Sequence, residues 1–304
     1  MSIQDNLDFN RYASMAEKYL NPSSAGAGVP ALTATVSVVL TIFYIASLFN
    51  DNLVEKMCLF PDALFSLPEF PRLNTYPLVH AGFLHIFFNL VSLWAPMAQF
   101  ETLNGTFHTA LVLSALSLVT AISYCLLGFY FFPDTSVLGC SGWVFSFIAY
   151  FSYVNSLQHK TIRFFGRFDI PTITVPFVFL GFVFLMVPNS SFVGHLLGII
   201  AGFVMAKGFL VPLTVLPMDL ISKVEVAAHK LIELIPHQLH YIRESDVKNG
   251  RYKYDNLSLP LYTTDAAVPM ASGDARVIGE AAEAGEAGSP ETFKGPGHVL
   301  GTSS

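Results

Sequence analysis

The feature that most constrains this chain is a series of six long apolar runs that hold almost no Lys or Arg. A helix that crosses a bilayer needs about 20 mostly apolar residues. The runs cover about 31–49, 78–100, 107–132, 135–154, 172–188 and 191–211. They predict an all-α polytopic membrane protein built as a bundle of six transmembrane helices.

The amino-acid composition favours the same prediction. Charged residues make up 12% of the 304 residues, whereas soluble domains average about 25%. This scarcity excludes a basic nucleic-acid-binding face, so no nucleic-acid partner is expected. It also argues against a large soluble helical core, which is the alternative explanation of the apolar runs. Cys58, Cys125 and Cys140 show no paired spacing, so neither a disulfide framework nor a thiolate metal site is expected.

Lys and Arg in short loops indicate how such a protein lies in the membrane. Lys160, Arg163 and Arg167 follow the fourth run, and three lysines follow the sixth. The loop 50–77, on the other side, holds only one Lys and one Arg and is itself rich in apolar residues. We therefore expect both termini in the cytosol and the 50–77 loop at the lumenal or exterior interface.

The chain divides into four segments by composition. Residues 1–30 form a polar cytosolic segment, and 31–211 form the six-helix domain. In 212–254, apolar residues recur at helical spacing up to Pro236, which predicts an amphipathic helix that lies on the membrane or packs on the loops. Residues 255–304 are rich in Ala, Gly, Glu, Ser and Pro, which is typical of a disordered tail.

Two runs begin with a polar side chain among small residues. Ser141 lies between Gly139 and Gly142 at the start of the fourth run, and His195 precedes Gly198 at the start of the sixth. Small residues at such spacing let membrane helices approach closely, so we expect Ser141 and His195 to meet near one membrane face. A histidine beside a serine can take the hydroxyl proton during nucleophilic attack. Neither run holds a carboxylate, which favours a dyad over a triad.

The second run holds further polar groups. His85 and Asn89 are four residues apart and share one helix face, so both are candidate donors to an oxyanion, together with a backbone N–H near Ser141. His80 is five residues from His85, about 140° around the helix, which makes the two a poor metal chelate. No acidic residue lies near to complete a zinc site, so we expect no metal and no cofactor.

Three motifs together resemble the rhomboid intramembrane serine proteases over about residues 31–211. They are His-x-x-x-Asn (His85, Asn89), Gly-x-Ser-Gly (139–142) and Gly-His-x-x-Gly (194–198). The resemblance implies that Ser141 is the nucleophile, His195 the general base, and His85 and Asn89 the oxyanion donors. It implies supporting roles for His80, Gly139, Gly142 and Gly198, with His80 near the active-site hydrogen-bond network. Substrates would be transmembrane proteins that enter from the lipid bilayer near the fifth run.

The resemblance extends to structural positions. Arg72 matches the arginine of the family's Trp-Arg pair, with Pro71 in place of the tryptophan, and Glu101 matches an acidic position that braces helices. The segments 76–78 and 94–96 and the long tail look like those of fungal Golgi rhomboid-like proteins. This likeness implies the Golgi membrane, with the endoplasmic reticulum as the alternative.

The tail contains one more motif. Residues 293–301 resemble the SHP box, by which proteins recruit the AAA-ATPase segregase (valosin-containing protein), with Phe293, Gly295, Gly297 and Leu300 at its positions.

Two hypotheses for the function of the chain follow from these motifs. The chain is a Ser-His protease that cleaves transmembrane substrates near the lumenal face with help from the segregase, or it is a non-catalytic rhomboid-like adaptor that delivers membrane clients to the segregase.

Overall fold

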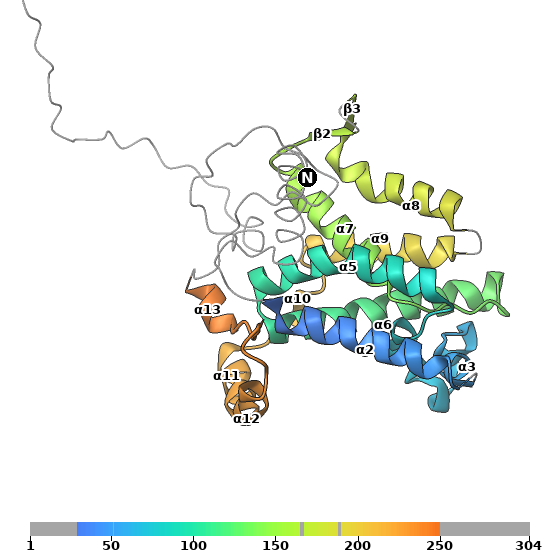
Figure 1. Cartoon of the computed structure of the whole chain (residues 1–304). Helices are drawn as coiled ribbons and strands as arrows, with labels where there is room; N and C mark the ends of the chain where they lie inside the picture. The colour runs from blue at the N-terminus through green and yellow to red at the C-terminus, as the bar shows by residue number, and fades with distance from the viewer. Residues whose placement is uncertain (1–28, 51, 165–166, 188–189, 250–304) are drawn as a thin grey trace, which may run out of the picture. The chain divides into compact units, whose positions relative to one another are not determined.

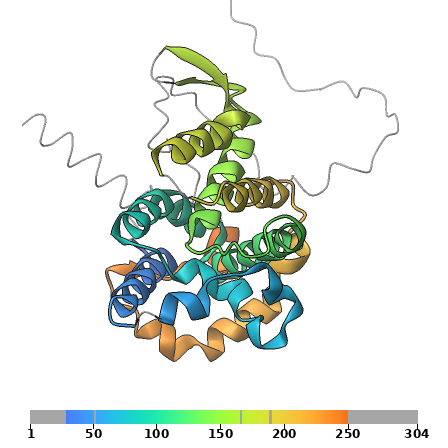
Figure 2. The same cartoon turned by 90° about the vertical axis from the view of Figure 1, so that its right-hand side faces the viewer.

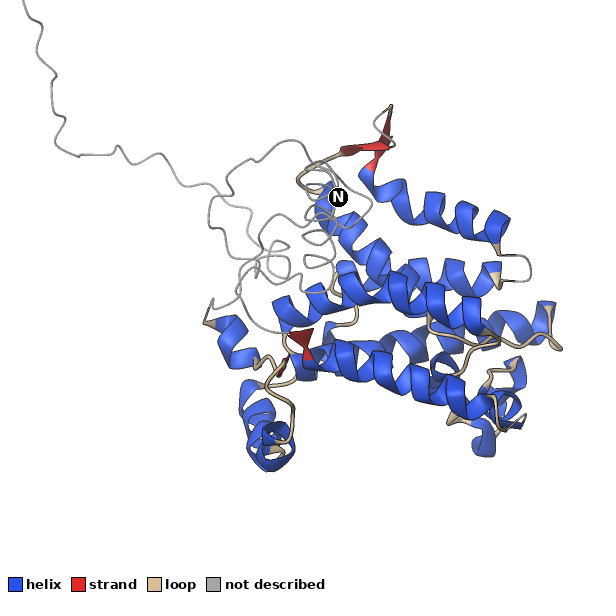
Figure 3. Cartoon of the chain, viewed as in Figure 1, coloured by secondary structure: helices blue, strands red, loops and turns tan. Residues whose placement is uncertain are grey.

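The computed structural model describes residues 29–50, 52–164, 167–187 and 190–249, and these residues are mostly helical (Figure 3). Nearly all of the predicted 1–30 segment and the whole predicted 255–304 tail, with its SHP-like motif, lie outside the described residues.

Each of the six apolar runs forms a helix, and the six helices pack side by side (Figures 1 and 2). By length and composition, α5 and α6 can each span a membrane, and α9 does so only together with the segment after an 88° bend. The described helices thus include two candidate spans, or three if the bent pair is one span, and the predicted number of six spans is not confirmed. The helices are α2 (Ala31–Ser47), α5 (Phe83–Asn104), α6 (Thr106–Phe131), α7 (Ser141–Ser156), α8 (Val175–Met186) and α9 (Phe192–Ala206).

Two helices begin later than the apolar runs predict. The second run was expected to be helical from 78, but α5 starts after Gly82, whose backbone is extended. The fourth was expected from 135, but Val137 pairs with Leu59 in an isolated β-bridge. Gly139 then takes a left-handed φ of 97°. Hydrophobicity does not separate these irregular segments from the helices, because they also hold no Asp, Glu, Lys or Arg.

The predicted loop 50–77 folds into short helices, which are α3 (Asn52–Met57), η1 (Pro61–Phe65), η2 (Leu67–Glu69), α4 (Arg72–Thr75) and η3 (Tyr76–Leu78). Arg72 holds this segment together without the tryptophan of the family pair. Its guanidinium donates to the carbonyls of Glu55 at 2.6 Å and Cys58 at 2.9 Å and forms an ion pair with Glu69. Leu59 and Leu73 pack in a cluster with residues of α6, so the segment is part of the folded core.

The tightest helix contact joins α7 to α9. An added Cβ at Gly198 would lie 2.8 Å from the carbonyl oxygen of Gly142, and one at Gly202 would lie 2.2 Å from that of Ser146. The Ser146 hydroxyl donates to the carbonyls of Gly142 and Gly198, both at 2.8 Å. Small residues of the two helices therefore face each other, and this close approach places the starts of both helices together.

Glu101 links three helices through hydrogen bonds. Its carboxylate accepts from the backbone N–H groups of Leu32 at 2.9 Å and Thr33 at 2.8 Å, which lie in the first turn of α2. It also accepts from the hydroxyl of Thr106, at 2.8 Å, at the start of α6. An acidic group at a helix N-terminus satisfies N–H groups that have no partner within the helix, so Glu101 braces α2, α5 and α6.

The segment after α9 holds the helix predicted up to Pro236 as two helices that meet at Ala228. It forms α10 (Val211–Thr214), α11 (Met218–Ala227) and α12 (His229–Glu233), and then β4 (Leu239–His240) and α13 (Glu244–Lys248). Glu225 of α11 is bound by Tyr241 and Arg243, each at 3.3 Å, and this contact ties α11 to the chain that follows it. β4 pairs in parallel with β1 (Val29–Pro30), at the entrance to α2.

A hairpin that we did not predict lies between α7 and α8. It consists of β2 (Thr161–Phe164) and β3 (Phe168–Pro171), which pair antiparallel, and it leads through η4 (Thr172–Thr174) directly into α8.

Candidate active site

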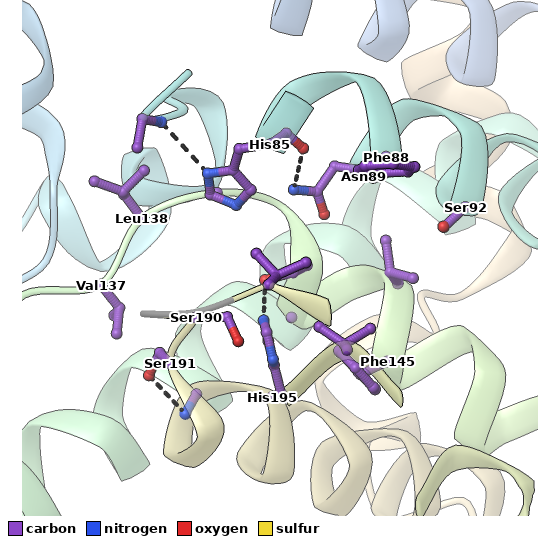
Figure 4. Close-up of a pocket in the computed structure, with 18 of the residues that line it drawn as sticks. His85, Phe88, Asn89, Ser92, Val137, Leu138, Phe145, Ser190, Ser191 and His195 are labelled. Atoms are coloured by element: carbon purple, nitrogen blue, oxygen red, sulfur yellow. Dashed lines mark hydrogen bonds between the residues drawn. The ribbon is translucent and has the colours of Figure 1, made fainter. Parts of the chain in front are cut away.

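A cavity of about 1000 Å³ opens among α5, α7, α8, α9 and the loop that precedes α7. Figure 4 shows His85 and Asn89 together on one helix, with His195 across the pocket from them. Ser141, Gly139 and Gly142 also line this cavity. The cavity thus gathers most of the residues that the sequence singled out, although they come from three separate segments of the chain.

Ser141 and His195 make a direct contact. The Nε2 atom of His195 lies 2.9 Å from the hydroxyl oxygen of Ser141. Ser141 is the first residue of α7, and His195 lies in the first turn of α9, whose N-cap Ser191 accepts from the N–H of Gly194 at 3.1 Å. Both side chains therefore sit at helix starts, where the packing of α7 on α9 aligns them.

The loop before α7 is fixed from both sides, and this sets the position of Ser141. The N–H of Gly139 donates to the carbonyl of Tyr76 at 2.9 Å. An added Cβ at Gly139 would lie 2.8 Å from Nε2 of His85. Glycine is needed here for two reasons, since the φ of 97° disfavours a side chain and the histidine ring occupies the space.

Phe145 orients the imidazole of His195 and was not identified from the sequence. The two rings are 4.6 Å apart at their centroids, with an interplanar angle of 30°. Phe145 lies four residues after Ser141, one helical turn along the same face of α7, and that spacing is the signal that could have identified it. The Nδ1 atom of His195 is buried and has no hydrogen-bond partner among the described residues. Ring packing therefore orients this imidazole.

His85 presents a donor to the cavity. Its Nδ1 accepts from the backbone N–H of Ala81 at 3.4 Å. A neutral imidazole that accepts at one nitrogen carries its proton on the other, so Nε2–H points toward Gly139 and the start of α7. Asn89 donates one N–H to the carbonyl of His85 at 2.9 Å, and its amide has a second N–H to offer.

His80 supports the site from behind rather than lining the cavity. It is 1% exposed, and its Nε2 lies 3.4 Å from the backbone N of Cys140 and 3.5 Å from the Cys140 sulfur. Its ring also packs against that of His85, with centroids 5.0 Å apart. His80 therefore contacts both the residue before Ser141 and one candidate oxyanion donor. Gly198 contributes only through the contact of α9 with α7.

The chain is similar to known proteins over most of its length. The Rhomboid domain family model matches residues 68–211, a range that contains Ser141, His195, His85 and Asn89. The chain is 34% identical to Rhomboid-type serine protease 2 of Kluyveromyces lactis, over 84% of this chain and 96% of that protein. It is 35% identical to Rhomboid-type serine protease 2 of Saccharomyces cerevisiae, over 79% of this chain and 90% of that protein. It is 38% identical to the protein of the same name from Yarrowia lipolytica, over 69% of this chain and 70% of that protein.

Proposed function

Since this chain belongs to the rhomboid family and is a rhomboid-type serine protease, we propose that Ser141 is its nucleophile and His195 its general base. The observation that carries this proposal is the 2.9 Å contact between the Ser141 hydroxyl and the His195 Nε2. During attack on a peptide carbonyl, His195 takes the hydroxyl proton, and it then gives that proton to the leaving amine. Water attacks the resulting acyl-enzyme by the same route in reverse and restores the serine.

The negative charge on the attacked oxygen needs donors already in place. We propose His85 Nε2–H, the second N–H of Asn89 and the backbone N–H of Ser141 for this role. The first N–H groups of a helix have no intrahelical partner, so the start of α7 has a donor to offer. The packing of His85 against His80 and Gly139 supports the role, because a donor held before the reaction costs no reorganisation during it.

We propose that the substrate is a transmembrane segment that enters the cavity from the lipid between α5 and α8. Phe88 of α5 and Phe182 of α8 line the cavity and are 54% and 58% exposed. This apolar entrance suits a chain that arrives from the bilayer. A helical substrate has its carbonyls bonded internally, so small or helix-breaking residues at the cut site should favour cleavage.

We further propose that all six long helices lie in the membrane, with both termini cytosolic and the site near the lumenal face. The Lys and Arg content of the connectors supports this orientation. The Golgi membrane, or else the endoplasmic reticulum, is proposed from sequence likeness alone. Contact of the exposed Leu220 and Leu231 with the interface stays a prediction.

The proposed chemistry predicts that a fluorophosphonate probe labels Ser141 covalently in the full-length protein. Labelling requires an activated hydroxyl, so His195→Ala should lower it to the level of Ser141→Ala. The measurement is in-gel fluorescence followed by peptide mapping. Absence of labelling in several detergents and in lipid would contradict the protease and would favour the adaptor that delivers membrane clients without cleavage.

We propose that the tail binds the AAA-ATPase segregase through Phe293, Gly295, Gly297 and Leu300. The support is the motif itself, in which two apolar anchors stand in a polar stretch. Replacing Phe293 and Leu300 with Ala should reduce co-purification of the segregase to background. The matched control replaces His298 and Val299 with Ala and should leave it unchanged. Equal recovery with both double variants would remove this partner.

A further inference from the structure

The β2–β3 hairpin, which has no part in the cavity, presents two different faces. In the antiparallel register, Ile162 pairs with Ile170 and Arg163 pairs with Asp169. Side chains alternate across a strand, so the isoleucine pair and the charged pair lie on opposite faces of the hairpin. One face is therefore apolar and the other is charged.

The apolar face extends beyond the rest of the protein. Ile162 and Ile170 are half-buried and pack against the main hydrophobic core. Phe168 lies on the same face, one alternation closer to the tip, yet it is 65% exposed. A Phe that continues a packed apolar face beyond the protein fits an element that lies in the membrane interface, where Phe, Trp and Leu side chains insert at the boundary of the acyl chains.

The hairpin as a whole is cationic. Within residues 160–171, Lys160, Arg163 and Arg167 outnumber the single carboxylate, that of Asp169. The Arg163 and Asp169 side chains form an ion pair at 3.5 Å but are 69% and 63% exposed. Such an exposed pair contributes little to stability, so the guanidinium groups are free to exchange partners with a stronger anion. Arginine is suited to phosphate because its planar fork can donate two hydrogen bonds at once.

The position of the hairpin favours lipid over a soluble partner. Figures 1 and 2 both show β2 and β3 projecting from the side of the bundle that carries α8, away from α2. The hairpin follows the end of α7 opposite Ser141. In a membrane-embedded bundle, an element that projects sideways at a helix end overlies the lipid headgroups next to the protein.

We propose that β2–β3 is an interfacial hairpin that binds anionic phospholipid headgroups through Arg163 and Arg167, with the Phe168 ring at the boundary of the acyl chains. Lys160, at the base of the hairpin, adds to the attraction. This inference rests on the proposed insertion of the bundle in the membrane, and it is independent of the chemistry at Ser141.

Lipid bound here acts on the start of α8. The N–H of Thr172 donates to the carbonyl of Lys160 at 2.9 Å, and the Thr172 hydroxyl donates to the carbonyl of His159. These bonds join the base of the hairpin to the end of α7, and η4 passes into α8 without a flexible linker. A lipid anchor on the hairpin therefore positions the helix whose Phe179 and Phe182 line the cavity.

The first test measures lipid retention by native mass spectrometry of the full-length protein in detergent, with phosphatidylserine and phosphatidylcholine as probes. Wild type should retain phosphatidylserine preferentially. The Arg163→Gln/Arg167→Gln variant should bind phosphatidylserine about 30-fold more weakly. Each cation near an anionic surface contributes about fivefold in affinity, and this variant removes two of them. The control Lys207→Gln/Lys248→Gln removes the same charge from exposed lysines outside the hairpin and should bind as wild type does. Equal loss in both variants, or no preference in wild type, would overturn the proposal.

The second test locates the aromatic side chain. A Phe168→Trp variant is reconstituted in phosphatidylcholine–phosphatidylserine vesicles, and its tryptophan emission is compared with that of wild type. The additional emission, from residue 168, should be quenched by brominated acyl chains and not by aqueous acrylamide. The opposite quenching pattern would overturn the proposal. Both tests should give the same result in a Ser141→Ala background, so a failure here is distinguishable from a failure of the proposed protease chemistry.

Discussion

Replacing Ser141 with Ala is expected to lower the rate of substrate cleavage by on the order of 10⁴-fold or more, because loss of a serine nucleophile removes the covalent route altogether. The folded structure should persist, since among the described residues the hydroxyl forms a hydrogen bond with His195 only. The measurement is cleavage of a transmembrane substrate in reconstituted vesicles, alongside thermal unfolding in detergent.

Ser92→Ala is the matched control for that experiment. Ser92 also lines the cavity, on α5, and its loss should change the rate only a few-fold because it carries no step of the proposed mechanism. Cleavage by Ser141→Ala at the wild-type rate would contradict the assignment of the nucleophile. A similar fall in both variants would show that any loss of a hydroxyl from the cavity disturbs it.

The second large effect is expected from Gly202→Ala. The new Cβ would lie 2.2 Å from the carbonyl oxygen of Ser146, a distance that the two backbones relieve only by moving apart. Overpacking of this kind costs about 1–3 kcal/mol of unfolding free energy. Because α7 carries Ser141 and α9 carries His195, a shift of about 1 Å should also cost roughly 100-fold in cleavage rate. Chemical unfolding and vesicle cleavage measure the two losses.

Gly181→Ala provides the matched control, because it makes the same change in α8, where an added Cβ has no neighbour within 4 Å. It should leave the rate unchanged and should stabilise the helix slightly, since Ala is a better helix former than Gly. If Gly202→Ala had the same unfolding free energy and the same cleavage rate as Gly181→Ala, the close contact of α7 with α9 would not be what aligns the site.

Much of the site depends on features that can be read locally. Apolar runs mark the helices because a helix in lipid must be apolar along its length, and all six runs are helical. The spacing of His85 and Asn89 places them on one face whatever the rest of the fold does. The small residues at 198 and 202 indicate a close helix contact before the partner helix is known. Membership of the rhomboid family, inferred from three short motifs, is confirmed.

Other features depend on residues distant in the chain and could not be predicted. The start of α7 is set by bonds from Val137 to Leu59 and from Gly139 to Tyr76. Arg72 holds the first loop through backbone carbonyls, which have no signature in the sequence. The helix predicted up to Pro236 forms as two helices that meet at Ala228, and the tie of α11 through Glu225 to the chain that follows it had no signal in the sequence.

The sequence by itself determined which long segments are helices and which small residues let two of them approach. It also identified the polar side chains within apolar runs, which are candidate functional residues because such groups are costly to bury. Those properties follow from periodicity and hydrophobicity, which are local. Only the tertiary structure decided that Ser141 and His195, 54 residues apart, lie within hydrogen-bond distance. It also decided that Phe145 packs on the imidazole and that the connector after α7 forms a hairpin with one apolar face. These arrangements arise from packing between segments, which no local pattern encodes.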